Sequence, residues 1–314
     1  MLVTGYFLVT SRGVKGKKLI LLLAEVLFYY LVTYAIATVI NGAAFGLEPS
    51  SLLMLFPTIL GRYWYATAYI VLYVMSPWIN HFVLSLERGQ LLRCICVLLI
   101  LYSVIPTVFG VFGNGTESFL FYTRLLWLFV IYLCGAFLRL HSLKMISTLK
   151  RSVCWAIGSF LFMVISLVVV AVNEEFFSWI GLTEWAYFWP PNTVPMFLAS
   201  LGVFAIFQNI ALPQSKAINR LASTTFGIYL IHDGPMQGII WRKIVNAASH
   251  QSSTLLPVFV LAAVLAVFLC CALIDMVRQL LQKWTLERIL ASEKWERWAS
   301  ASLSRVDGFI ENRL

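Results

Sequence analysis

Charged side chains are scarce in this sequence. Of its 314 residues, only 12% are Asp, Glu, Lys or Arg, whereas 61% are hydrophobic. Soluble globular domains have about 25% charged and about 45–50% apolar residues. A chain with so few charges cannot bury its apolar side chains in one water-soluble core, so we infer that its solvent is the lipid bilayer.

The sequence also lacks the period-two alternation that is typical of membrane β-barrels. Its long apolar runs of about 18–23 residues have instead the length of spanning helices. We therefore predict an all-α fold, a polytopic membrane helix bundle with about nine transmembrane segments, the first incomplete. The predicted segments are 1–10, 19–41, 62–83, 94–112, 119–138, 152–173, 193–212, 224–241 and 254–275.

Cysteine pairs and metal-binding motifs are missing as well. None of the six cysteines forms a C-x-x-C pair, and no His or carboxylate lies at metal-ligand spacing. We expect the cysteines to be small packing residues. The sequence predicts neither a disulfide framework nor a metal site.

Most of the positive charge lies in alternate loops. On one side, the only basic loop residues are Arg242 and Lys243. Because Lys and Arg accumulate on the cytoplasmic side, we predict a multi-pass protein of the cell membrane with a cytoplasmic C-terminus. The net charge of +9 then reflects membrane topology, and we expect no nucleic-acid partner. The basic side comprises loops 11–18, 84–93, 139–151 and 213–223 and the C-terminal tail.

The two ends of the chain differ in character. Segment 1–10 runs inward in this topology and has about half the length of a spanning helix, so we expect further sequence upstream of Met1. Its basic residues follow the apolar stretch, which is not the order of a signal peptide. Residues 276–314 are predicted to form a basic amphipathic tail on the membrane surface, with Trp284, Trp295 and Trp298 on one side. The transmembrane domain would then comprise residues 1–275.

Three ionisable residues within the apolar segments are candidate catalytic groups, because such residues are costly in a membrane. Glu25 shares a helix face with Tyr29, and the alternative is a carboxylate hydrogen-bonded to a tyrosine of a neighbouring helix. Arg124 is expected about two turns below the surface, pointing inward. His232 is a candidate general base or a neutral structural histidine, and Gly234 and Pro235 favour an opening of its helix.

A second group of side chains is a candidate lining for a substrate site. Arg62, Trp64 and Tyr69 belong to one segment, and Tyr229 precedes His232 by three residues. For Arg62 the alternative is a side chain that extends to the membrane interface. The aromatic stretch 176-FFSWIGLTEWAYFWPPN-192 is either an interfacial belt or a platform on which sugar rings stack.

Several stretches of the sequence are distinctive in their order and spacing. They are 4-TGYFLV-9 and the basic loop after it, 63-YWYATAYIVLYVMSPWIN-80, 123-TRLLWLFVIYLCGAFLRLH-141 and 219-NRLASTTFGIYLIHDGPM-236. Together they resemble the membrane-bound acyltransferase-3 family, in particular its surface-polysaccharide branch. The resemblance covers most of the chain and implies a ten-helix enzyme that moves an acyl group, commonly acetyl, from acetyl-CoA to a sugar hydroxyl of a cell-surface glycan.

The resemblance implies roles for individual residues. The basic motif after the family's second helix appears as Lys15-x-x-Lys18, so Lys15, Lys17 and Lys18 are expected to bind the phosphates of acetyl-CoA or another acyl-CoA. The family's first helix, which carries a catalytic histidine and an arginine, would precede Met1. His232, with Arg124 and Glu25, is the remaining catalytic candidate.

The implied partners are the lipid bilayer, the acyl-CoA co-substrate, a glycan acceptor and proteins of polysaccharide assembly, with no bound cofactor. Two alternatives remain open from the sequence. One is a transporter or flippase of a lipid-linked glycan, since broken helices with buried charges suit that class too. The other is a truncated, non-catalytic remnant of the acyltransferase that pairs with another membrane protein.

Overall fold

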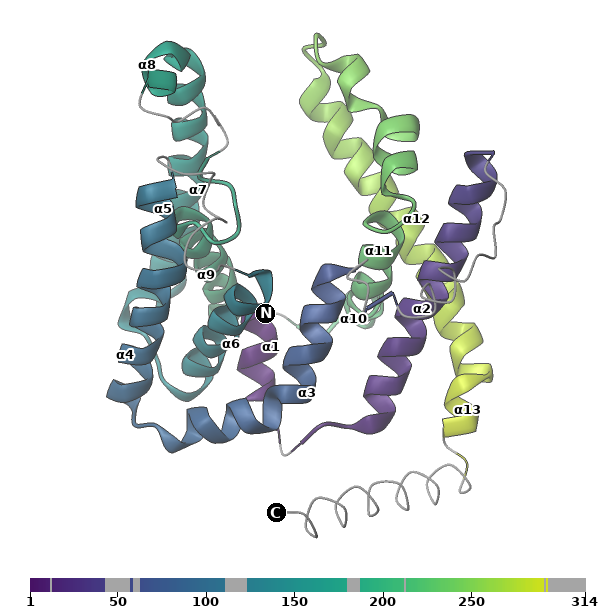
Figure 1. Cartoon of the computed structure of the whole chain (residues 1–314), viewed down its shortest axis with the longest axis horizontal. Coiled ribbons are helices and arrows are strands. Elements are labelled where there is room, and N and C mark those ends of the chain that lie inside the picture. Colours follow the sequence, from purple (N-terminus) through teal and green to yellow (C-terminus); the bar gives the residue numbers. More distant parts are fainter. Residues whose placement is uncertain are drawn as a thin grey trace. The chain divides into compact units, whose positions relative to one another are not determined.

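The structure is a computed structural model, in which the described residues form helices joined by turns and irregular segments, with no strand among them (Figure 1). This confirms the predicted all-α fold of a polytopic membrane protein. The described residues are 1–11, 13–42, 57–58, 63–110, 123–179, 187–211, 213–290 and 292. Arg62, Trp295 and Trp298, which the sequence singles out, lie outside them.

Five of the nine predicted segments form helices that are long and apolar enough to cross a membrane. The helices α6 (Arg124–Leu140) and α9 (Val194–Asn209) are shorter, at about 26 and 24 Å. The five spanning candidates are α2 (Gly16–Ile40), α3 (Trp64–Ser85), the continuous helix Arg88–Phe109, α7 (Leu149–Val172) and α12 (Leu256–Trp284), which continues with α13 (Leu286–Leu290).

The remaining elements are short. The helix Arg88–Phe109 consists of α4 (Arg88–Leu99), the π-helical turn η2 (Ile100–Val104) and α5 (Ile105–Phe109). The others are α1 (Leu2–Leu8), η5 (Lys144–Ile146), α8 (Glu174–Trp179), α10 (Lys216–Ala222), α11 (Thr225–His232), η6 (Ile239–Val245) and η7 (Ala247–His250).

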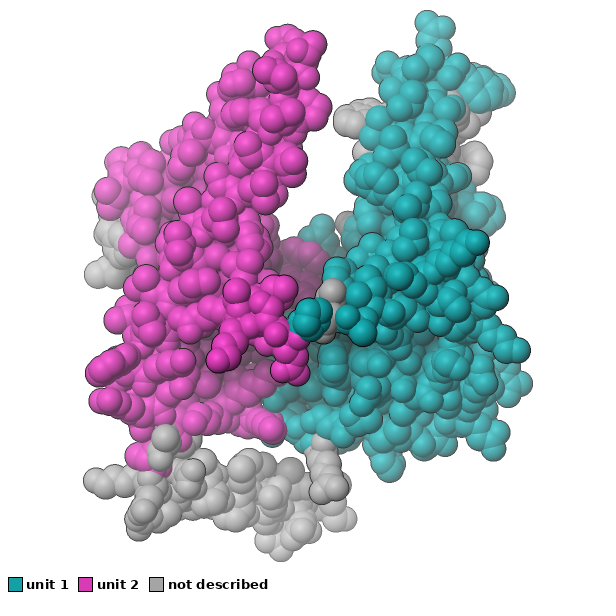
Figure 2. Space-filling view, turned by 180° about the vertical axis from the view of Figure 1, so that it is seen from behind, with its two compact units in different colours: residues 1–14, 68–213 teal, residues 15–67, 214–314 magenta. Residues whose placement is uncertain are grey.

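The chain folds into two compact units (Figure 2). Unit 1 comprises residues 1–14 and 68–213, and unit 2 comprises residues 15–67 and 214–314. The boundary between the units falls within α3, near its N-terminal end.

Glycine brings the helices of unit 1 into backbone contact. A Cβ on Gly5 of α1 would lie 2.0 Å from the carbonyl oxygen of Tyr132, and one on Gly135 of α6 would lie 2.1 Å from that of Leu2. Gly202 brings α9 equally close to α7, where a Cβ would lie 2.5 Å from the amide nitrogen of Ala156. Small residues at such crossings let membrane helices pack closely.

A buried hydrogen-bonded chain completes the packing of unit 1. The Tyr132 hydroxyl donates to Oδ1 of Asn80 at 2.7 Å, and the Asn80 amide donates to the carbonyl of Leu8 at 2.7 Å. These bonds connect α6, α3 and α1, and they satisfy polar groups that lipid would leave without partners.

In unit 2, α11 packs against α2 and α12 around a core that includes Val26, Tyr30, Tyr63 and Leu230. The predicted segment 224–241 is not one helix, because α11 ends at His232 and a π-helical stretch begins at Ile239. The break contains Gly234, whose backbone lies against Tyr63 so closely that a Cβ would be 2.3 Å from the hydroxyl. The opening that Gly234 and Pro235 indicated is thus present.

The last helix is longer than predicted. The apolar segment 254–275 was expected to end before a separate tail, but α12 continues through Asp275 to Trp284. Residues 276–284 contain no glycine or proline and several good helix formers, so nothing stops the helix at the end of the apolar run. The division into a domain 1–275 and a tail 276–314 stays a prediction.

Candidate functional site

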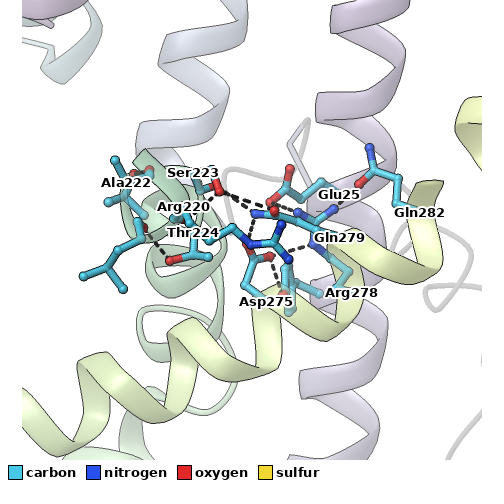
Figure 3. Close-up of polar contacts among 12 residues, drawn as sticks. Glu25, Arg220, Ala222, Ser223, Thr224, Asp275, Arg278, Gln279 and Gln282 are labelled. Atoms are coloured by element: carbon cyan, nitrogen blue, oxygen red, sulfur yellow. Dashed lines mark hydrogen bonds and ion pairs between the residues drawn. The ribbon is translucent and has the colours of Figure 1, made fainter. Parts of the chain in front are cut away.

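Unit 2 contains a buried cluster of charged side chains between α2 and α12 (Figure 3). The Arg278 guanidinium lies 3.0 Å from Oε1 of Glu25 and 2.6 Å from Oδ1 of Asp275. The Asp275 side chain is fully buried, and those of Arg278 and Glu25 are 9% and 15% exposed. One guanidinium therefore faces two carboxylates, one from each helix.

Asp275 is the centre of the hydrogen bonds in this cluster. Its Oδ1 accepts from the Tyr29 hydroxyl at 2.7 Å and from Nε of Arg278, and its Oδ2 accepts from the Gln279 amide at 2.8 Å. The Gln279 amide also donates to the backbone carbonyl of Ser223, at the end of α10. A buried carboxylate is tolerated when its oxygens are satisfied in this way.

Glycine makes room for this carboxylate. A Cβ on Gly227 of α11 would lie 2.2 Å from Oδ1 of Asp275, so only glycine permits α11 to pack this closely against α12. Through Tyr29, Gln279 and Gly227, Asp275 connects α2, the end of α10 and α11 to α12. The cluster therefore fixes the helix that carries His232.

Beside the cluster lies a small pocket of about 190 Å³, lined by Glu25, Arg278, Gln282 and Thr285 together with apolar neighbours. Arg278 also donates to the side chain of Gln282, one turn further along α12. Among the residues that line the pocket, none comes from α11. His232 and Glu25 thus belong to different surroundings within unit 2.

The partner of Glu25 is not the tyrosine that the sequence suggested, and its catalytic role stays a prediction. Its carboxylate pairs with Arg278, whereas the tyrosine hydroxyl on its own helix, Tyr29, bonds to Asp275. Tyr29 is four residues from Glu25, and the two do share the side of α2 that faces α12. The partner was not foreseen because, by sequence, Arg278 falls in the predicted tail.

The sequence did contain a signal for this cluster. Asp275, Arg278, Gln279 and Gln282 recur at spacings of three and four residues, which places them along one face of a helix. These residues share one helix face only if the predicted helix continues past residue 275.

His232 is the last residue of α11 and is half-buried. Its Nδ1 lies 2.6 Å from the carbonyl oxygen of Ile228. A carbonyl oxygen only accepts, so Nδ1 carries the proton and Nε2 retains its lone pair in the neutral ring. Nε2 hydrogen-bonds to none of the described residues. The ring edge meets Trp241, with centroids 6.1 Å apart.

Tyr229 lies three residues before His232, on the same side of α11. Its ring makes edge contacts with Tyr63 and Tyr65, with centroids 6.0 and 5.7 Å apart. Its hydroxyl is buried, donates a hydrogen bond to no described residue and lies close to backbone amides in the first turn of α3. The neighbouring Tyr63 hydroxyl, in contrast, donates to the carbonyl of Leu230 at 2.8 Å. Tyr229 thus supplies a hydroxyl group with spare hydrogen-bonding capacity beside His232.

Arg124 lies elsewhere than expected. It is the first residue of α6, in unit 1, with an exposed side chain, and not two turns inside a helix. Thr123 before it caps the helix by accepting a hydrogen bond from the Leu126 amide at 3.2 Å, so the helix begins here. The assignment of Arg124 to a catalytic set stays a prediction.

The other candidates lie on α2 and α3. Lys15, Lys17 and Lys18 are exposed at the start of α2, where Lys15 is the N-cap residue. Trp64 is partly exposed at the start of α3 and makes an edge contact with Tyr65. Tyr69 stacks on Tyr73 with ring planes 2° apart, which leaves its role as a substrate contact a prediction.

One protein family matches most of the chain. The family model described as an acyltransferase domain, acyltransferase 3, matches residues 1–275. The chain belongs to the acyltransferase-3 family. The match includes Glu25, His232 and Asp275, whereas Arg278 lies beyond it. Neither the curated proteins nor the solved structures contain a match.

Membership in the acyltransferase-3 family makes this protein a membrane acyltransferase. The sequence resemblance is thereby confirmed at the level of the family. Among the described residues, no group of three or more His, Cys, Asp or Glu side chains is arranged to hold a metal ion. The polar groups of unit 2 that could act on a substrate are the His232 imidazole, the Tyr229 hydroxyl and the Glu25–Arg278 ion pair.

Proposed function

We propose that this acyltransferase-3 protein transfers an acyl group, in the simplest case acetyl, from acyl-CoA to a hydroxyl group of a cell-surface polysaccharide or its lipid-linked precursor. The single observation that carries the proposal is the state of His232. Its Nδ1 is engaged by the Ile228 carbonyl, so the basic Nε2 is directed away from the helix backbone and is available to a hydroxyl group.

The reaction needs one base and one oxyanion partner. Nε2 of His232 takes the proton of the acceptor hydroxyl, whose oxygen attacks the thioester carbonyl carbon. The carbon–sulfur bond then breaks, the acyl group stays on the acceptor oxygen, and the thiolate of CoA leaves and takes up the proton. The Tyr229 hydroxyl is buried and donates to no described residue. We assign it as the hydrogen-bond donor to the developing oxyanion or to the acceptor.

The acyl-CoA would bind where the basic residues begin α2. Lys15, Lys17 and Lys18 are exposed there, and the N-terminus of a 25-residue helix favours anions. Lysine contacts phosphate as a point charge rather than through the bidentate fork of arginine. We place this side of the protein in the cytoplasm, which supplies the CoA ester.

Glu25 and Arg278 act differently in this proposal. Their ion pair, together with Asp275, holds α2, α11 and α12 together. We assign Glu25 as a positioning residue that maintains the location of His232 on α11. This distinguishes it from His232, which contacts the acceptor.

The decisive variant is His232→Asn. The asparagine amide replaces the Nδ1 donor to Ile228 but has no counterpart of Nε2, so local structure is kept and the base is lost. We expect acyl transfer in membranes supplied with labelled acetyl-CoA and extracted surface glycan to fall by a factor of about 10²–10⁴. The matched control is His250→Asn, at an exposed histidine stacked on Phe259.

Two results would contradict the proposal. Unchanged transfer by His232→Asn would remove His232 from the reaction. Acyl-CoA-independent movement of a lipid-linked glycan across vesicles, with no transfer of label by the wild-type protein, would favour the flippase alternative. An equal loss in His250→Asn would point to general damage and also count against a specific role for His232.

A further inference from the structure

Unit 1 contains a large apolar cavity that the proposed reaction does not use. Its volume is about 1070 Å³, at the upper end of the range of roughly 300–1,000 Å³ that holds small-molecule ligands. The lining comes from α1, α6, α7 and α9 and from the residues just before α9. All of these elements belong to unit 1, in which α1 packs on α6 and α9 on α7 (Figure 1).

The cavity is elongated along α9. Lining residues recur on one face of this helix, from Met196 through Ser200 and Val203 to Phe207, which is nearly its whole length. Sixteen helical residues span about 24 Å. Pro191 and Trp189 line the cavity before the start of α9, and Gln208 lines it at the end. An apolar space that follows a helix over this length fits a hydrocarbon chain.

One end of the cavity is positively charged. Arg139 lies in the last turn of α6. Its guanidinium lies 5.1 Å from the centroid of the Tyr6 ring, and a terminal guanidinium nitrogen donates to the Tyr6 hydroxyl at 3.4 Å. Both residues line the cavity. No described carboxylate lies within ion-pair distance of Arg139, and the loop that follows α6 is basic. This end is therefore suited to an anion.

We propose that this cavity is a binding site for a membrane lipid with an anionic phosphate headgroup. The headgroup lies at Arg139 and Tyr6, and one acyl chain extends along α9 towards Trp189. Basic side chains at the ends of membrane helices commonly hold lipid headgroups in this manner. The proposal is independent of the chemistry at His232, which lies in the other unit.

Native mass spectrometry of the whole protein in mild detergent tests the site, with phosphatidylglycerol and phosphatidylcholine of identical acyl chains as competing ligands. The wild-type protein should retain the anionic lipid preferentially. Arg139→Gln should reduce the ratio of anionic to zwitterionic lipid about tenfold, because a charge-assisted hydrogen bond is lost. Arg93→Gln, at an exposed arginine of α4 in the same unit, is the matched control and should leave the ratio unchanged.

A second variant tests the binding of the lipid's acyl chain rather than that of its headgroup. Ser200 lies midway along the lining face of α9 and is exposed in the cavity, so Ser200→Trp fills the space. We expect about tenfold less retention of both lipids. Ile165→Trp on α7, at an exposed position outside the lining, should retain them as the wild type does.

The proposal is overturned by equal retention of both lipids in the wild type, by an unchanged ratio in Arg139→Gln, or by full retention in Ser200→Trp. A loss in Arg93→Gln that equals the loss in Arg139→Gln also overturns it, because the preference would then be a general effect of surface charge. Displacement of the lipid by palmitoyl-CoA but not by CoA alone would instead assign the cavity to a long-chain acyl donor.

Discussion

The two units of this protein hold their helices together by different means. In unit 1, Gly5 and Gly135 let α1 and α6 meet backbone to backbone, and the polar contacts among Tyr132, Asn80 and Leu8 are neutral. In unit 2, α2 and α12 meet through Glu25, Asp275 and Arg278. The hydrophobic effect contributes little to contacts between membrane helices, so close packing and polar bonds are the available interactions. Unit 1 relies mainly on close packing at glycines, and unit 2 relies on ion pairs and hydrogen bonds.

The difference has a consequence for function. Neutral, glycine-mediated contacts leave unit 1 with a long apolar cavity beside them. The charged cluster of unit 2 fixes α11, where His232 and Tyr229 lie. Ionisable groups inside a membrane domain usually have a function. Here we assign Glu25 to positioning and His232 to proton transfer.

The largest effect should come from breaking the charged cluster. Arg278→Met leaves Asp275 and Glu25 without their cation, and we expect the free energy of unfolding of unit 2 to fall by about 3–5 kcal/mol. Thermal unfolding in detergent measures this. If charge is the cause, adding Glu25→Gln and Asp275→Asn to Arg278→Met should recover much of the loss. A triple variant no more stable than Arg278→Met would contradict the comparison.

A smaller effect is expected at the glycine contacts of unit 1. Gly5→Ala or Gly135→Ala places a methyl group where a backbone oxygen lies about 2 Å away, and the resulting shift of α1 against α6 should cost about 1–3 kcal/mol. The control is Gly158→Ala in α7, where a Cβ would meet nothing within 4 Å. There we expect no loss, or a gain of up to about 1 kcal/mol from helix propensity.

The smallest effect should follow from Tyr132→Phe, which removes the hydroxyl that donates to Asn80. One buried hydrogen bond contributes about 1 kcal/mol, and the fold of unit 1 should persist because the ring still packs. Tyr102→Phe in η2 is the matched control, since that hydroxyl bonds to no described residue. Equal shifts of the melting temperature in the two variants would show that the Asn80 bond contributes nothing.

Much of the fold was predictable from local sequence. The apolar runs place helices at each of the nine predicted segments, because a spanning chain must satisfy its backbone internally. The ends of the helices were predicted less accurately than their positions. The end of α12 at Trp284 was missed because hydropathy falls after residue 275 while helix propensity does not. Gly234 and Pro235, in contrast, did indicate the break after His232.

The candidate site was predictable only in part. His232 and Tyr229 share a face of one short helix, a relation that spacing alone reveals. Glu25 was identified as unusual, but its partner Arg278 lies far along the chain, and no periodicity connects the two. Arg124 was expected inside an apolar segment, whereas α6 begins at this residue, because hydropathy does not show where a helix begins.

The sequence by itself thus determined that this protein is a helical membrane protein and which ionisable residues are out of place in lipid, since composition and spacing are local properties. Only the tertiary structure decided that Arg278 and Asp275 complete the Glu25 cluster and that four helices of unit 1 line an apolar cavity. These depend on contacts between distant segments, and such contacts are set by how whole helices pack.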